Sequence, residues 1–277
     1  MGWGIAAAAV MLLIGFYLFL VWPGRLAPSQ RAALGGRSYA HRGLFDHEAG
    51  IPENSLAAFR AAVQAGYGCE VDVQFTKDRQ LIAFHDSDYR RACGTDQKVW
   101  ALNYDEVREY TLFGTGEKIP LFSEVLALVS GRQPLIVEIK THGGDVAWYQ
   151  AQCRETLRLL REYDGVYGIQ SFHPLAVRWF QKNARDVPRG LLITGRKHGP
   201  HAFGKWLASK LFISCVFCRP GFVATDQEAR GWALRLVRAL GAMSFAWTIK
   251  TPRRFEALSA VEDGIIFEGF RPPAHLK

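Results

Sequence analysis

The chain begins with one long hydrophobic segment. From Trp3 to Trp22 it contains only apolar residues, glycine and one tyrosine, and every charged residue of the protein lies at Arg25 or later. At about 1.5 Å per residue, a helix of this length spans the ~30 Å hydrocarbon core of a bilayer. Tryptophan stands at both ends, where aromatic residues contact lipid headgroups, and the Pro-Gly pair that follows stops a helix. The pattern predicts one transmembrane helix within an anchor over residues 1–24.

A cleaved signal peptide is the alternative interpretation of this segment. It is less favoured because no basic residue precedes the apolar run and because the run is long for the apolar region of a signal peptide. Arg25, Arg31 and Arg37 follow the run, and basic residues mark the cytoplasmic side of a membrane helix. We therefore expect a single-pass membrane protein whose remaining chain lies in the cytoplasm.

Beyond a short linker at residues 25–36, short apolar and β-branched runs alternate with helical periodicity. The candidate strands are residues 38–41, 69–75, 81–85, 135–139, 167–172, 190–193, 222–225, 245–249 and 264–267. Between them, Asn54 stands where it can cap a helix, and Pro174 and Pro252 stand where helices begin. Residues 37–277 have the size of one barrel domain.

Loop length identifies one of these runs as the return strand of a hairpin. Only the segment T-K-D-R-Q separates Phe75 from Leu81, which is too short for a parallel crossover, so the second and third runs form an antiparallel pair. The other runs alternate with helices, which is the pattern of an α/β fold of the (β/α)8 or TIM barrel type. A doubly wound open sheet is the alternative, because the number of strands does not prove closure.

Composition narrows the function classes. The chain has 277 residues, 49% hydrophobic and 22% charged, which excludes a disordered or fibrous protein. The net charge of +8 is scattered, so we expect no nucleic-acid binding, although a negatively charged surface or substrate suits it. The five cysteines do not suggest a disulfide framework and suit a reducing compartment. The sequence leaves the oligomeric state open.

Titratable residues collect at the carboxyl ends of the predicted strands, where TIM barrels carry their active sites. In chain order they are His41, Arg42, Glu70, Asp72, His85, Glu138 and Lys140. Residues two apart on a strand point to the same side, so Glu70 and Asp72 project together. Carboxylates inside apolar strands are costly to bury unless a cation compensates them. Three converging carboxylates therefore suggest a divalent cation, Mg²⁺ or Ca²⁺.

Short motifs surround these residues in a fixed order. They are A-H-R-G (40–43), P-E-N-S (52–55), E-V-D-V (70–73), F-H-D (84–86), V-E-I-K (137–140), Q-S-F (170–172) and W-T-I (247–249). From about residue 38 to about residue 268 the chain thereby resembles the glycerophosphodiester phosphodiesterase family. The resemblance implies a TIM barrel of the PLC-like phosphodiesterase type that uses a divalent cation. It also implies hydrolysis of phosphodiesters of the glycerol or lysophospholipid type.

The resemblance further implies a role for each titratable residue. By motif, the acid and base are His41 and His85, the metal ligands are Glu70, Asp72 and Glu138, and the phosphate contacts are Arg42 and Lys140. Two imidazoles suit two proton transfers, one from the attacking group and one to the leaving alkoxide. Which histidine is the acid stays open, as does whether water or a neighbouring hydroxyl of the substrate attacks.

Three further residues are expected to support the site, and each also has an interpretation without catalysis. Glu53 and Asn54 are expected beside the metal site, but Asn54 can simply cap a helix and Glu53 can favour a helix N-terminus. Trp247 is expected to form an apolar wall for a glycerol or lipid moiety, or to be a core residue.

The chain departs from the family pattern at three positions. Arg79 stands in the hairpin turn where the family often has Gly, and Lys250 and Glu268 stand where it often has Asn and Asp. The last two positions fall at the mouth of the barrel, so the departures leave substrate choice open.

Three functions are compatible with these observations. The first is a membrane-tethered, metal-dependent phosphodiesterase of lipid metabolism, and the second is a barrel phospholipase of lyase type that produces a cyclic phosphate. The third is a catalytically silent lipid-binding protein, which is disfavoured because the histidines and carboxylates are all present.

One segment outside these motifs has two possible functions. His198-x-x-His201 and Cys215-x-x-Cys218 have the residue types of a zinc site, although nothing else in the chain requires one. The basic and apolar residues from Arg196 to Phe217 can instead lie against an anionic membrane. The plain alternative is a barrel helix with a solvated basic edge.

Overall fold

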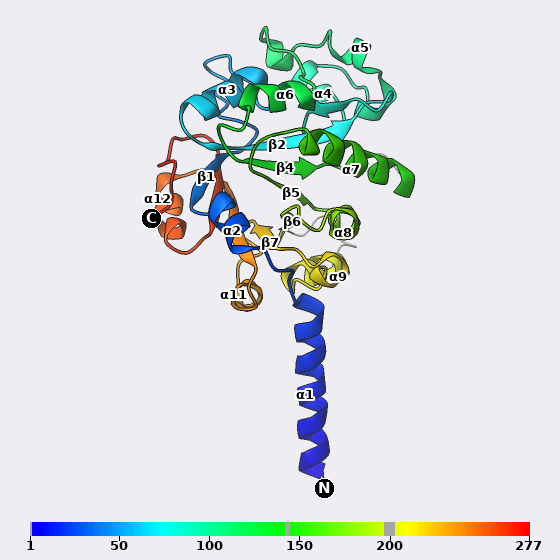
Figure 1. The fold of residues 1–277 in the computed structure, drawn as a ribbon, viewed down its shortest axis with the longest axis vertical. Helices are drawn as coiled ribbons and strands as arrows, with labels where there is room; N and C mark the ends of the chain where they lie inside the picture. The colour runs from blue at the N-terminus through cyan, green and yellow to red at the C-terminus, as the bar shows by residue number, and fades with distance from the viewer. Residues whose placement is uncertain (1, 142–144, 197–202) are drawn as a thin grey trace.

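Eight parallel strands close into a barrel in the computed structural model, which describes residues 2–141, 145–196 and 203–277 (Figure 1). The barrel strands are β1 (Arg37–Ala40), β2 (Gly68–Phe75), β4 (Leu135–Ile139), β5 (Tyr167–Ser171), β6 (Arg189–Ile193), β7 (Phe222–Thr225), β8 (Met243–Ile249) and β9 (Gly264–Phe267). Each strand pairs in parallel with the next, and β1 pairs with both β2 and β9. This closure confirms the predicted TIM barrel and excludes the doubly wound sheet.

The predicted hairpin is also confirmed. Strand β3 (Leu81–Ala83) pairs antiparallel with β2. Arg79 in the turn has a φ of 61°, in the left-handed region that glycine adopts most easily, which accounts for the glycine that the resemblance led us to expect there.

After β3 the chain makes a long excursion before it returns to the barrel at β4. Residues 84–121, which we call the excursion, contain α4 (Arg90–Cys93), η1 (Val99–Ala101), α5 (Tyr104–Val107) and η2 (Leu112–Gly114), and α6 (Phe122–Val129) follows. The excursion has its own small apolar core, in which Phe84, Tyr89 and Val99 are buried. It therefore packs as a unit beside the barrel mouth.

Helices cover the outside of the barrel (Figure 1). They are α3 (Leu56–Gln64), α7 (Val146–Arg161), α8 (Pro174–Asn183), α9 (Phe203–Lys210), α10 (Cys215–Cys218), α11 (Trp232–Ala239) and α12 (Pro252–Ser259). Pro174 and Pro252 occupy the first helical positions as predicted, where the missing N–H is no loss. Val71 and Val137 on the strands pack outward into the main apolar core with these helices.

Large side chains fill the barrel interior towards the amino-terminal ends of the strands. The rings of Phe222 and Phe245 lie so close to Gly190 and Gly264 that a Cβ on either glycine would meet a ring carbon at 2.0 or 2.1 Å. Leu34 also reaches this core from α2 (Pro28–Leu34), a helix inside the segment expected to be a linker. With apolar side chains at its base, the barrel carries its polar side chains at the carboxyl end.

The N-terminal helix α1 (Gly2–Val21) projects away from the barrel on the side where α9 and α11 lie (Figure 1). Its segment Trp3–Val21 has a mean hydropathy of 2.5 and is 6% buried, so it is long and apolar enough to cross a membrane, as a signal sequence would also be. Val21 packs into a core with α10, and the Gly24 amide donates to the Pro220 carbonyl at 2.9 Å. The helix is therefore attached firmly to the barrel.

Candidate active site

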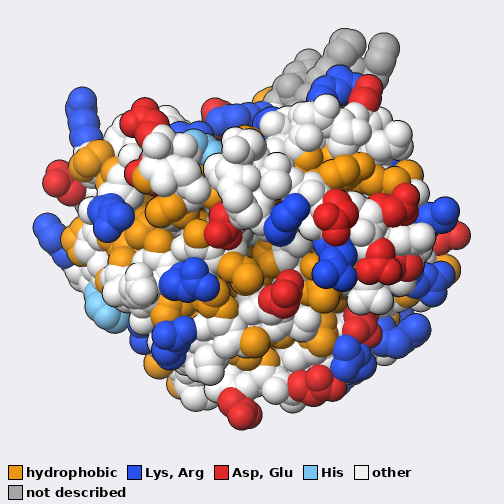
Figure 2. Space-filling model, turned by 90° about the horizontal axis from the view of Figure 1, so that it is seen from above, with side chains coloured by type: hydrophobic (Ala, Val, Ile, Leu, Met, Phe, Trp, Pro, Cys, Tyr) orange, Lys and Arg blue, Asp and Glu red, His pale blue; other side chains and the backbone are white. Residues whose placement is uncertain are grey.

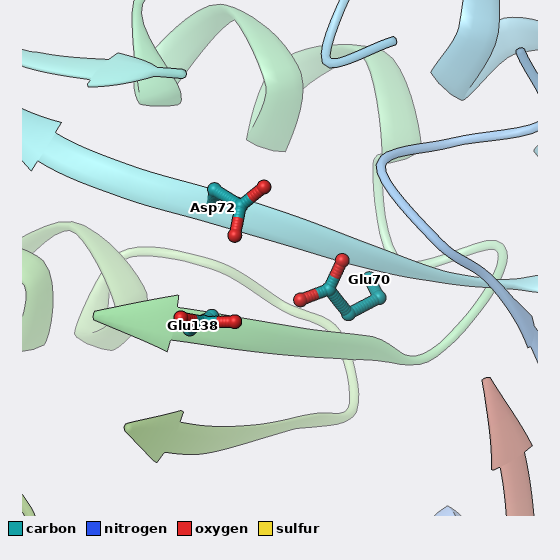
Figure 3. A group of neighbouring side chains, drawn as sticks. All are labelled: Glu70, Asp72 and Glu138. Carbon is teal, nitrogen blue, oxygen red and sulfur yellow. The ribbon is translucent and has the colours of Figure 1, made fainter. Parts of the chain in front are cut away.

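Three carboxylates from two neighbouring strands meet near the carboxyl end of the barrel (Figure 3). Glu70 and Asp72 lie on β2, and Asp72 stands directly opposite Glu138 on β4. All three side chains are buried, and one oxygen from each lies within 4.8 Å of the others. The structure therefore brings together the three residues predicted to hold a metal.

Two cations partly neutralise this acidic cluster. The Lys140 ammonium lies 2.9 Å from Asp72 Oδ1 and 2.5 Å from Glu138 Oε1, and Arg42 Nε lies 3.3 Å from Asp72 Oδ2. The backbone amide of Arg42 also donates to Glu70 Oε2 at 3.1 Å. Both residues predicted to bind phosphate thus lie against the acidic cluster.

The pKa shifts show where negative charge remains poorly compensated. Burial raises the pKa of Glu70 well above its usual range, and the neighbouring Asp72 and Glu138 carboxylates raise it further. Burial also raises the pKa of Glu138, against the opposing effect of Lys140. At Asp72 burial acts in the same direction, but Lys140 and other nearby cations outweigh it and lower the pKa. A hard divalent cation fits this oxygen donor set, because it would relieve the repulsion at Glu70.

The first predicted histidine follows β1 and is held by a carboxylate from the far end of the chain. His41 Nδ1 lies 2.6 Å from Glu268 Oε2, and the other Glu268 oxygen forms an ion pair with Lys250. Burial lowers the pKa of His41, although its bond to Glu268 opposes the shift. Burial raises the pKa of Glu268, but His41 and Lys250 outweigh that effect and lower it to about 2. The Glu268 carboxylate is therefore ionised and fixes one ring nitrogen of His41.

The second predicted histidine lies at the start of the excursion and has a similar partner. His85 Nδ1 lies 2.6 Å from Asp86 Oδ1, and the Arg91 guanidinium donates to Asp86 Oδ2 at 2.7 Å. Burial raises the pKa of Asp86, but its hydrogen bonds from His85 and Arg91 outweigh that effect and lower it. Each imidazole is thus held at Nδ1 by an ionised carboxylate, and no hydrogen bond to Nε2 of either ring is found among the described residues.

Glu53 and Asn54, expected to support the site, connect its parts. Glu53 accepts two hydrogen bonds from Arg91, at 2.7 and 2.9 Å, and one from Arg42 at 2.5 Å. Asn54 donates to Asp72 Oδ2 at 2.9 Å. The capping interpretation of Asn54 is wrong, because its φ is 55° and the following Ser55 caps α3 by accepting from the Ala58 amide.

Both histidines, Glu70, Glu138 and the cations beside them border one cavity of about 1070 Å³ at the barrel mouth, whereas Asn54, Asp72 and Asp86 are not among its lining residues. Trp247 lines it, half-buried, with its ring edge-to-face against Phe172 at 5.4 Å. Arg196, Arg253 and Arg254 also line the cavity, together with Asp226 and with Glu228, which pairs with Arg196 at 3.4 Å. The cavity therefore combines an acidic metal-type cluster with an aromatic wall and cationic side chains.

Sequence reasoning missed four residues of this site. Asp86 and Gln170, which donates to Glu70 Oε1 at 3.3 Å, both lie within motifs that were quoted without a role for them. Glu268 was noticed as a departure from the family pattern, but not as the partner of His41. Arg91 has no sequence signal, because its contact with Glu53 depends on the folding of the excursion.

The possible zinc site is only partly within the described structure. Cys215 and Cys218 are buried free thiols on α10, and burial raises the pKa of both, to about 12 for Cys218. His198 and His201 lie outside the described residues.

A closed barrel with acids, imidazoles and cations around one cavity at its carboxyl end defines the chain as a TIM-barrel enzyme. The profile of the Glycerophosphoryl diester phosphodiesterase family matches residues 41–268, and the chain belongs to this family. The predicted class, phosphoric diester hydrolase, is thereby confirmed.

Individual relatives agree with this assignment. A glycerophosphodiester phosphodiesterase from Caldanaerobacter subterraneus is 32% identical over 55% of this chain and 65% of its own length. The lysophospholipase D GDPD1 of Rattus norvegicus is 29% identical over 66% of this chain and 62% of its own length. The chain thus spans less than two thirds of either relative.

A solved structure shares the fold. A phosphodiesterase from Oleispira antarctica, in complex with the product sn-glycerol-3-phosphate, superposes with a TM-score of 0.70 at 19% identity. The match covers 86% of this chain and 94% of that one.

The lowered pKa of Glu268 predicts that the folded protein loses stability as the pH falls into the acid range. A carboxylate whose folded-state pKa is about 2 stabilises the fold above its ordinary pKa of about 4.5, and this stabilisation is lost as the pH falls towards 2. We expect Glu268→Gln to lose less stability than wild type between pH 5 and pH 2, as measured by denaturant unfolding with chelator present. Glu256→Gln on α12, an exposed carboxylate without an ion pair among the described residues, is the control. An equal loss in wild type and Glu268→Gln would contradict the prediction.

Proposed function

We propose that the chain hydrolyses glycerophosphodiesters or lysophospholipid-type phosphodiesters in a reaction that depends on a divalent cation. The observation that carries the proposal is the buried cluster of Glu70, Asp72 and Glu138 between two carboxylate-held histidines. The name of the rat relative, a lysophospholipase D, supports the lysophospholipid class. The three carboxylates would hold Mg²⁺ or Ca²⁺, which supplies positive charge where the phosphodiester develops negative charge.

The other side chains bind the substrate and transfer protons. Arg42 and Lys140 take up charge on the phosphate oxygens, and Trp247 packs against the glycerol or acyl part of the substrate. One of His41 and His85 accepts the proton of the attacking water as its oxygen bonds to phosphorus. The other protonates the leaving alkoxide as the P–O bond breaks, so an alcohol and a phosphomonoester are released.

Substitution of either histidine tests this proton transfer. We expect His41→Ala and His85→Ala each to lower kcat by roughly 10²-fold or more, because general acid-base groups contribute on that scale. His275→Ala, outside the cavity, serves as the matched control and should keep wild-type kcat. Wild-type turnover in either site variant with unchanged melting temperature would remove that histidine from the mechanism.

Removal of the metal tests the role of the carboxylates. Loss of several kcal/mol of charge stabilisation corresponds to a fall of about 10²-fold or more in kcat, so we expect excess chelator to abolish activity and Mg²⁺ or Ca²⁺ to restore it. The assay uses a panel of glycerophosphodiesters and lysophospholipids. Full activity in chelator would reject the metal-dependent mechanism.

Product analysis of the same assay separates the alternative functions. Phosphorus NMR should show a phosphomonoester, whereas a lyase-type phospholipase stops at a cyclic phosphate. A folded protein that binds the lipids and releases neither product would instead be the catalytically silent binding protein.

We also propose that residues 1–24 remain attached as a membrane anchor, with residues 37–277 as the catalytic domain in the cytoplasm. The exposed apolar surface of α1, the absence of charge before Arg25 and the arginines soon after it support this arrangement. An amphiphilic substrate can then reach the cavity by diffusing along the membrane.

Protease protection tests the topology. Protease added to sealed, right-side-out cells should leave the barrel intact, because the membrane separates the two, and detergent should then make it digestible. Digestion in sealed cells, or a mature N-terminus beyond Trp22, would show that the first segment is an export signal or an anchor of opposite orientation.

A further inference from the structure

A second cavity, of about 700 Å³, lies where α1 joins the barrel. Its basic lining residues are Arg178 and Lys182 on α8, Arg185 and Arg189 between α8 and the start of β6, and Arg219 after α10. Trp22 and Phe217 line the cavity as well. We call it the anchor cavity, and it is distinct from the cavity at the barrel mouth.

The anchor cavity carries positive charge without compensation. Asp and Glu are absent from the described residues that line it. Across the described residues, none of its five basic side chains has a carboxylate within ion-pair distance. Elsewhere the charges are mixed: the face opposite α1 shows basic and acidic side chains side by side (Figure 2).

Arg189 is the most constrained of these cations. It is half-buried, its Nε is buried without a hydrogen-bond partner, and its Nη2 makes one long bond of 3.4 Å to the Arg219 carbonyl. Burial lowers its pKa, and the nearby Arg185 charge lowers it further. A guanidinium withdrawn from water beside another cation is costly unless an anion compensates it.

Arg219, at the edge of the cavity, binds the C-terminal end of α1. Its Nη1 donates to the carbonyls of Phe19 and Trp22, at 2.6 and 2.8 Å, and so caps the C-terminal end of α1. A Cβ on Gly24 would meet the Arg219 carbonyl at 2.4 Å, so this close approach requires glycine. The basic residues are thereby held beside the end of the apolar helix.

The aromatic residues indicate the depth of the anchor cavity. Trp22 and Phe217 are 43% and 48% exposed, and Trp22 directly follows the apolar segment of α1. Aromatic and basic side chains together at the end of a membrane helix are typical of the headgroup level of a bilayer.

We propose that the anchor cavity binds the phosphate headgroup of an anionic phospholipid. The phosphate lies among Lys182, Arg185 and Arg189, and the acyl chains pass Trp22 and Phe217 towards the apolar surface of α1. The inference rests on the proposed insertion of α1 and not on the proposed hydrolysis, because the bound lipid is not the substrate of the cavity at the barrel mouth.

Lipid titration of the full-length chain in non-ionic detergent tests this proposal. Phosphatidylglycerol and phosphatidylcholine with the same acyl chains are compared by native mass spectrometry. We expect phosphatidylglycerol to bind roughly tenfold tighter, because charge-assisted bonds to phosphate are the strong ones and the choline cation repels the cavity. Equal affinity for the two lipids would overturn the proposal.

Variants localise the binding. We expect the double variant Arg185→Gln, Arg189→Gln to weaken phosphatidylglycerol binding by roughly tenfold or more, with little change for phosphatidylcholine. Arg154→Gln, an exposed arginine of α7 without an ion pair among the described residues, is the matched control. If the double variant has a lowered melting temperature, Lys182→Gln replaces it, with an expected fall of about fivefold. Unchanged affinity in the folded variants would reject the site.

Two further measurements separate the possible failures. Inorganic phosphate should not compete at the lipid concentrations used, and competition there would assign the cavity to a free anion instead. Extraction of membranes at alkaline pH tests the anchor on its own. Release of the protein would reject the anchor and the lipid site together, whereas retention without lipid preference would reject the lipid site alone.

Discussion

Electrostatic compensation of buried carboxylates determines how the carboxyl end of the barrel is built. Glu70, Asp72 and Glu138 are withdrawn from water on adjacent strands, and this placement is stable only beside positive charge. Lys140 and Arg42 supply part of that charge, and the raised pKa of Glu70 shows that it is insufficient. The same imbalance, which costs stability in the free protein, would favour the binding of a divalent cation to this cluster.

One of the two histidines, His85, is connected to this arrangement through a chain of ion pairs. Glu53 joins Arg42, beside the acidic cluster, to Arg91, which in turn holds Asp86 against His85. His41 is held separately, by Glu268 at the end of the last strand. His85 is therefore held by its neighbour in the sequence, Asp86, whereas His41 is held by a residue near the other end of the chain. Pairing of β1 with β9 closes the barrel and brings His41 to Glu268.

Much of this could be predicted from the sequence because it follows from local rules. Strand periodicity and loop length predicted the barrel and its hairpin, and the alternation of side chains on β2 predicted that Glu70 and Asp72 project together. Contacts between distant segments could not be predicted in the same way. Glu268 meets His41 only after closure, and the alternative that Asn54 caps a helix stayed open because its left-handed backbone is not visible in the residue type.

The excursion packs around an apolar core of its own, separate from the main core of the barrel. His85, Asp86 and Arg91 lie on the excursion, whereas the acidic cluster belongs to the barrel strands. Segments with separate cores can open locally at different free energies. In the proposed mechanism, cation binding and turnover would therefore be separable: a change that loosens the excursion would slow the chemistry while the barrel keeps its acidic cluster.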